Sequence, residues 1–105
     1  MAPEKLYSAG ECPVCLGVGA LFFLKSRPDG TIFLMCPHCE YCLAAPLREG
    51  ELYPNGDSVH RFAPGGVISF PTREEIVAAF SEQAIVGEYA YEEWGDSFFG
   101  KYLND

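Results

Sequence analysis

Two short hydrophobic segments with a turn between them lie in the first half of the chain. Ala20–Arg27 and Thr31–Met35 together combine aromatic and β-branched residues, as strands commonly do. The tripeptide between them is Pro28-Asp29-Gly30. Proline presets φ at the first position of a turn and glycine readily takes up the left-handed conformation, so the tripeptide is typical of a tight turn. The pattern predicts an antiparallel β-hairpin.

A helical pattern begins near residue 72. Thr72 is the predicted N-cap, and Glu75, three residues later, completes a capping box. Apolar residues then recur on one side of the predicted helix, which is expected to end near Gly87. The residues of this apolar stripe are Ile76, Val77, Phe80 and Ala84.

Residues 89–103 repeat the helical pattern more loosely and predict a second helix, which Gly95 and Gly100 weaken or divide. Six of the fourteen residues from Tyr89 to Tyr102 are aromatic, and carboxylates alternate with them. We expect these rings to pack on the sheet. The alternative is an exposed aromatic and acidic surface that binds a protein partner. The candidate residues of that partner-binding surface are Trp94, Phe98 and Tyr102.

The residues between the hairpin and the first helix are rich in turn-forming glycine and proline. Short extended pieces are expected at Ser58–Phe62 and Val67–Phe70, and one of them is expected to add a strand to the sheet. The predicted fold class is therefore α+β: a small, metal-bound antiparallel sheet, then a connector, then one or two C-terminal helices. The predicted segments, which form one compact domain, are residues 8–46, 47–71 and 72–105.

Two copies of the motif C-P-x-C flank the predicted hairpin. They are Cys12-Pro13-Val14-Cys15 and Cys36-Pro37-His38-Cys39. Four thiolates brought together by a hairpin form a closed tetrahedral site for one Zn²⁺, and such a site also accepts iron. A closed site leaves no coordination position for water or substrate. The metal is therefore expected to be structural, and the chain is not expected to be an enzyme.

The fifth cysteine leaves an alternative open. Cys39-Glu40-Tyr41-Cys42 is also a C-x-x-C, so Cys42 could replace Cys36 as a ligand. We favour Cys36, because the proline after it matches the first motif and because Met35 ends the predicted strand just before it. Cys42 is then expected to be a small, half-buried apolar residue on the strand that follows, and a redox or ligand-exchange role is the alternative.

These motifs resemble the zinc-ribbon superfamily, whose members hold two C-x-x-C knuckles on a small antiparallel sheet. The arrangement of ribbon, loop and helical end also resembles that of small acidic bacterial zinc-ribbon proteins. Leu16 and Glu40 stand where rubredoxins, which bind iron through similar knuckles, usually have glycine, so the match to rubredoxins is weaker. A rubredoxin-like protein or a thiol-redox or metal-relay protein is the further alternative. Zinc ribbons occur in transcription and translation factors, in enzymes and as structural modules. The resemblance therefore implies a fold and a metal more than a function.

Charge separates the remaining function classes. The 105 residues have a net charge of −8, and residues 72–105 carry two Lys or Arg against eight Asp or Glu. An acidic surface is unfavourable for binding nucleic acid, so we favour a function that depends on a protein partner. The alternative is nucleic-acid binding through Lys25, Arg27 and Arg48. The first residues lack an apolar signal core, and the apolar runs are too short to span a bilayer. We expect a cytoplasmic protein with reduced thiols and no membrane contact.

Overall fold

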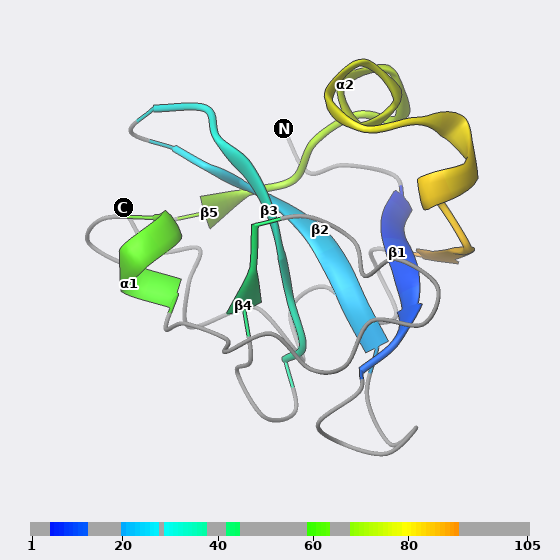
Figure 1. Cartoon of the computed structure of the whole chain (residues 1–105), viewed down its shortest axis with the longest axis horizontal. Helices are drawn as coiled ribbons and strands as arrows, with labels where there is room; N and C mark the ends of the chain where they lie inside the picture. The colour runs from blue at the N-terminus through cyan, green and yellow to red at the C-terminus, as the bar shows by residue number, and fades with distance from the viewer. Residues whose placement is uncertain are drawn as a thin grey trace.

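An antiparallel sheet organises the part of the chain that the computed structural model describes, which comprises residues 5–12, 20–27, 29–37, 42–44, 59–63 and 68–90. Within these residues the sheet has the strand order β4-β3-β2-β1-β6, and β5 pairs with β2 beside this path (Figure 1). The expected α+β class with an antiparallel sheet is confirmed. The strands are β1 (Lys5–Glu11), β2 (Ala20–Ser26), β3 (Ile32–Met35), β4 (Cys42–Leu43), β5 (Ile68–Ser69) and β6 (Gly87–Ala90). The helices are α1 (Val59–Phe62), α2 (Arg73–Ala79) and the 3₁₀ helix η2 (Glu82–Ala84).

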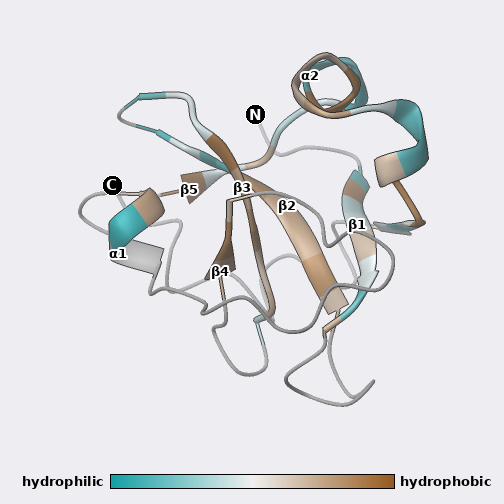
Figure 2. Cartoon of the chain, viewed as in Figure 1, coloured by the Kyte–Doolittle hydropathy of each residue, from teal (hydrophilic) through white to brown (hydrophobic). Residues whose placement is uncertain are grey.

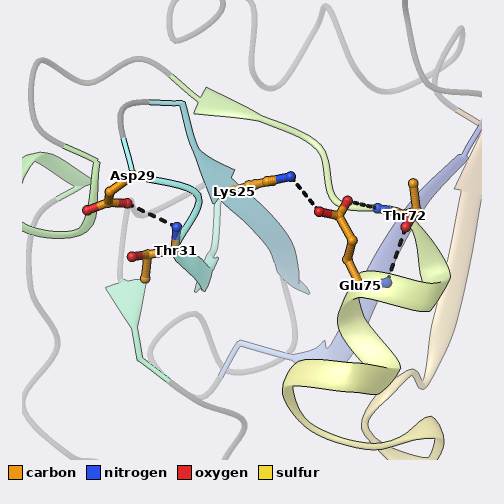
Figure 3. Close-up of polar contacts among 5 residues, drawn as sticks. All are labelled: Lys25, Asp29, Thr31, Thr72 and Glu75. Carbon is orange, nitrogen blue, oxygen red and sulfur yellow. Dashed lines mark hydrogen bonds and ion pairs between the residues drawn. The ribbon is translucent and has the colours of Figure 1, made fainter.

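The predicted hairpin is β2 and β3. These strands pair antiparallel from Phe22↔Met35 to Lys25↔Ile32. In the turn, the Gly30 N–H donates to the Ser26 carbonyl at 2.8 Å, and Gly30 has a φ of 76°. The Asp29 carboxylate accepts from the Thr31 N–H at 3.0 Å (Figure 3), a bond that lowers the pKa of Asp29. The hairpin prediction is confirmed, and the turn is held by hydrogen bonds between residues close together in the sequence.

β1 precedes the first C-P-x-C motif and begins at Lys5, before the predicted ribbon boundary at residue 8. It pairs with β2 at Ser8↔Phe22 and Glu11↔Ala20, so β1 has one residue more than β2 between these two pairs. Gly10 lies inside this interval with a φ of 112°, a conformation that favours glycine. The result is a β-bulge, which the sequence analysis did not predict.

The two expected extended pieces of the connector have different outcomes. Ile68–Ser69 is a strand, β5, and it pairs with the far end of β2, which confirms the expected addition to the sheet. The expected extended piece over Ser58–Phe62 is wrong, because Val59–Phe62 forms the single turn of α1. The Phe62 ring stacks on Phe33 with their centroids 5.3 Å apart, so packing on the sheet stabilises a turn that local preference does not favour.

α2 begins as predicted but ends early. Thr72 is the N-cap, and both hydrogen bonds of the capping box with Glu75 are present. The predicted continuation to Gly87 is wrong: α2 ends at Ala79, and the chain then forms η2 and β6. β6 pairs with β1 from Lys5↔Ala90 to Ser8↔Gly87, and this pairing with a distant strand overrides the helical pattern.

The helix expected over residues 89–103 is wrong at its first two residues, which belong to β6. The aromatic packing expected for this segment is confirmed for Tyr89, whose ring meets Phe22 edge-on with the centroids 5.0 Å apart. Residues 91–103 lie outside the described residues.

Both faces of the central strands are buried, and alternate residues of β2 and β3 point to opposite faces. Most of the length of these two strands is hydrophobic (Figure 2). We call one the Cys36 face and the other the Cys42 face. α2 and η2 cover the Cys36 face. Residues of α1, β5 and β6, and Ala63 directly after α1, pack against the Cys42 face. The buried residues of the Cys36 face are Cys12, Leu21, Phe23, Leu34, Cys36, Leu43 and Ile76. Those of the Cys42 face are Leu6, Phe22, Leu24, Phe33, Met35, Cys42, Ala63 and Ile68.

Among the described residues, no helix is long and apolar enough to cross a membrane.

Candidate metal centre

Cys12 and Cys36, the first cysteines of the two C-P-x-C motifs, lie at the same end of the sheet. Cys12 follows the last residue of β1, and Cys36 follows the last residue of β3. Because β1 and β3 are both antiparallel to β2, they run in the same direction and end where β2 begins (Figure 1). The fold therefore starts both motifs at one edge of the molecule.

The same two cysteines also share a face. Their exposed fractions are 1% for Cys12 and 0% for Cys36, and both belong to the buried cluster of the Cys36 face. That cluster is otherwise apolar. Thiolate sulfur is a ligand that soft divalent cations such as Zn²⁺ prefer, so the two cysteines fit one part of such a site.

The bulge in β1 is the reason that Cys12 shares a face of the sheet with Cys36. Tyr7 and Ala9 pack on the Cys36 face, and strict alternation from them would turn Cys12 to the opposite face. The extra residue between Ser8 and Glu11 shifts the alternation by one. Cys12 consequently joins the cluster that contains Cys36.

Cys42 lies on the other side of the sheet. It is in β4, directly opposite Met35, and it belongs to the buried cluster of the Cys42 face with an exposed fraction of 0%. Its expected position on the strand after the second motif is confirmed, but it is fully buried where a half-buried residue was expected. Since adjacent residues of a strand point to opposite faces, Cys42 shares the face of Met35 and not that of Cys36.

The other predicted site residues are not described. Cys15 and Cys39, half of the predicted ligand set, lie outside the described residues, as do Trp94, Phe98 and Tyr102 of the candidate partner surface. Within the described ranges no group of three or more His, Cys, Asp or Glu is close enough to hold a metal. The two predicted ligands that the structure describes thus lie on the same face, at the same end of the sheet.

The ion pair between Lys25 of the hairpin and Glu75 of α2 was missed by the sequence analysis. The Glu75 carboxylate pairs with the Lys25 ammonium through one oxygen, and its other oxygen accepts from the Thr72 N–H at 2.9 Å (Figure 3). Both contacts favour the charged carboxylate, and together they lower the pKa of Glu75, with the Lys25 bond the larger cause. The available signal was Lys25 itself, a lone charge at the end of an apolar strand.

An open pocket of about 370 Å³ lies between β1 and the segment that follows β5. In this region β2 pairs first with β1 and then, further along, with β5. The two cations of the pocket already have carboxylate partners: Lys5 pairs with Glu88 at 3.4 Å and Arg73 with Glu82 at 2.7 Å. The pocket therefore offers no marked attraction for an anion. Its lining residues are Lys5, Tyr7, Phe70, Pro71, Thr72, Arg73 and Glu74.

Comparison with known proteins yields no match to a protein-family model, a curated protein or a solved structure. Nothing about the activity can therefore be transferred from a relative.

Proposed function

We propose that this chain is a zinc-ribbon protein in which Cys12, Cys15, Cys36 and Cys39 bind one structural Zn²⁺. The observation that supports the proposal is the burial of Cys12 and Cys36 on one face, at one end of the sheet, each at the start of a C-P-x-C motif. A C-x-x-C segment supplies two thiolates from one tight turn, and two such turns side by side complete a tetrahedron.

The metal would act as a cross-link in this arrangement. It would join the connection between β1 and β2 to the connection between β3 and β4, two segments far apart along the chain. A structural zinc site of this kind contributes about 10 kcal/mol of apparent folding free energy at neutral pH, because the site is absent from the unfolded chain. A domain with so small a core gains much from such a contribution.

The burial of Cys42 on the opposite face favours Cys36 over Cys42 as the fourth ligand. It also weighs against the redox role considered for Cys42, because redox-active thiols are generally accessible and have a low pKa. We therefore propose that Cys42 is a packing residue.

We further propose that the protein works through a protein partner and not through catalysis or nucleic acid. Four thiolates leave no open position on the metal for a substrate. Lys25, one of the cations considered for nucleic acid, is already paired with Glu75. The net charge of −8 is also unfavourable for contact with phosphates and suits a basic partner surface.

Metal analysis of the purified full chain tests the zinc site. We expect one zinc per chain, bound through reduced thiols. Chelation should unfold the region from residue 8 to residue 46, which amide hydrogen exchange would report. Retention of the native amide spectrum after complete removal of metal would contradict a structural role.

The partner role needs a separate test. A double variant with Trp94→Ala and Phe98→Ala should remain folded and zinc-bound yet lose the partner that co-purifies with the wild-type chain. Retention of every partner by a folded double variant would rule out this surface.

A further inference from the structure

The pocket beside β1 forms where two strands share one edge of β2. β1 pairs with β2 as far as Ser8↔Phe22, and β5 pairs with the far end of β2 from Lys25↔Ser69. The chain then leaves β5 and runs to the start of α2 (Figure 1). The space of about 370 Å³ between the start of β1 and this segment is at the small end of the range for ligand sites, with room for one long side chain.

Two aromatic residues and a proline supply the apolar part of the lining. Tyr7 belongs to β1 and packs on the Cys36 face, whereas Phe70 directly follows β5 and packs on the Cys42 face. Both are half-buried, so the core holds each of them in place while they border the pocket. Pro71 completes this apolar part. Aromatic rings attract a cation that lies over their face, and the attraction is stronger where water is partly excluded.

The charged residues of the lining leave one carboxylate unpaired. Lys5 pairs with Glu88 and Arg73 pairs with Glu82, and both of these glutamates lie outside the lining. Glu74 also lines the pocket, and among the described residues its side chain has no ion pair or hydrogen bond. The charge that remains unbalanced in the lining is therefore negative.

The charge of the whole chain acts in the same direction. With a net charge of −8, the protein attracts cations over longer distances. Aromatic residues next to an unpaired carboxylate are complementary to an ammonium or guanidinium group carried on an apolar stem, as in lysine and arginine.

We propose that this pocket binds the side chain of a lysine or arginine that belongs to a basic partner protein. The apolar stem packs on the aromatic residues and Pro71, and Glu74 balances the charge of the head group. The proposal rests on the partner role proposed above, for which it supplies the chemistry of one contact. It does not depend on the metal.

The test is a titration of the isotope-labelled, full-length protein with Nα-acetyl-lysine methylamide at low salt, followed in the amide spectrum. We expect shifts that saturate and that include the amides of Tyr7, Phe70 and Glu74. The norleucine derivative keeps the stem but lacks the ammonium group, and it should bind at least about threefold more weakly. Nα-acetyl-arginine methylamide should compete for the same site.

Variants of the lining separate the contributions of the charge and of the ring. Glu74→Gln should weaken binding of the lysine derivative about threefold, the factor expected for the loss of one exposed ion pair. Tyr7→Leu should weaken it by a similar factor, whereas Tyr7→Phe, which keeps a ring, should bind as wild type does. Glu11→Gln is the matched control for Glu74→Gln, because Glu11 is exposed at the opposite end of β1 and outside the lining. It should leave the affinity as in wild type.

Each contrary outcome has a definite meaning. Equal binding of the norleucine derivative would overturn the cation site, because apolar contact alone would explain the affinity. Equal weakening in Glu11→Gln would also overturn it, because net charge alone would then attract the ligand.

Failure of the site and failure of the partner role are distinguishable. No shift at the three pocket amides of folded wild type would overturn the site, and it would leave intact the partner role that the Trp94 and Phe98 variant tests. Saturating shifts at these amides, in a protein that captures no partner, would support the site and overturn the partner role.

Discussion

The two faces of the sheet carry cysteines that are equally buried but differ in their surroundings. On the Cys36 face, Cys12 and Cys36 follow strands separated in sequence and lie at the end where both C-P-x-C motifs begin. On the Cys42 face, Cys42 lies opposite Met35 among apolar side chains, as a packing residue would. Burial alone therefore does not distinguish the proposed metal ligands from a core residue. The face that each cysteine occupies separates them.

The most severe way to break this comparison is to remove the bulge that places Cys12. Deletion of Gly10 takes away the extra residue, so that either Cys12 or the start of β1, including Leu6, must face the wrong side. We expect loss of zinc and of most of the roughly 10 kcal/mol that a structural zinc contributes. Metal analysis and chemical denaturation would measure both.

Gly10→Ala is the control for that deletion, because it keeps the residue count. A Cβ at Gly10 would have its nearest described neighbour, a Val86 methyl, at 4.0 Å, so space is available. The positive φ still costs about 1–2 kcal/mol for a residue with a Cβ. This variant should bind one zinc. If the deletion variant also bound zinc normally, the role of the bulge would be refuted.

A matched pair of core truncations compares the two faces directly. Leu34 and Met35 are adjacent in β3, both have an exposed fraction of 0%, and they point to opposite faces. Leu34→Ala and Met35→Ala should each lower the free energy of unfolding by about 2–5 kcal/mol. The rate at which zinc passes from the protein to a competing chelator should increase more in Leu34→Ala than in Met35→Ala. Equal acceleration would mean that the rate of zinc release depends on the stability of the whole fold and not on packing of the Cys36 face.

A smaller effect is expected from the charge of Glu75, and it depends on pH. The pKa of Glu75 is lowered below its ordinary value of 4.5 in the folded chain, so the unfolded chain takes up this proton first as the pH falls. The resulting stabilisation is present above pH 4.5 and is lost as the pH falls through the folded pKa. Because the pair is partly exposed, Glu75→Gln should cost no more than about 1 kcal/mol at neutral pH.

Denaturation of Glu75→Gln and wild type as a function of pH would measure this contribution to the free energy of unfolding. Glu82→Gln, which breaks the more exposed pair with Arg73, serves as the control. The difference between Glu75→Gln and wild type should shrink as the pH falls below 4.5. A difference that stayed constant down to the acid transition would show that the Glu75 charge does not stabilise the fold.

Residues with local partners were predictable from the sequence. The hairpin turn at Gly30 and the capping box of Thr72 and Glu75 depend on neighbours a few residues away, and both are present. The residues of β6 were predicted to be helical. Their conformation depends on pairing with β1, and the local sequence pattern carries no information about a partner so distant in the chain. The helical turn at Phe62 was missed for the same reason, since its ring stacks on Phe33.

For the candidate site as well, the sequence predicted local features but not those that depend on strand pairing. Spacing identified the two motifs, but it could not say which face each cysteine would occupy. That depends on the bulge at Gly10 for Cys12 and on the register of β4 against β3 for Cys42. Both are matters of strand pairing, in which a shift of one residue reverses every side chain.

The most direct test of the account is the zinc content of three full-length proteins purified in parallel: wild type, Cys36→Ser and Cys42→Ser. The two substitutions are chemically identical, and both replace a fully buried cysteine. We predict one zinc per chain in wild type and in Cys42→Ser, and loss of tightly bound zinc in Cys36→Ser. Full zinc in Cys36→Ser together with its loss in Cys42→Ser would contradict the assignment of the metal to the Cys36 face.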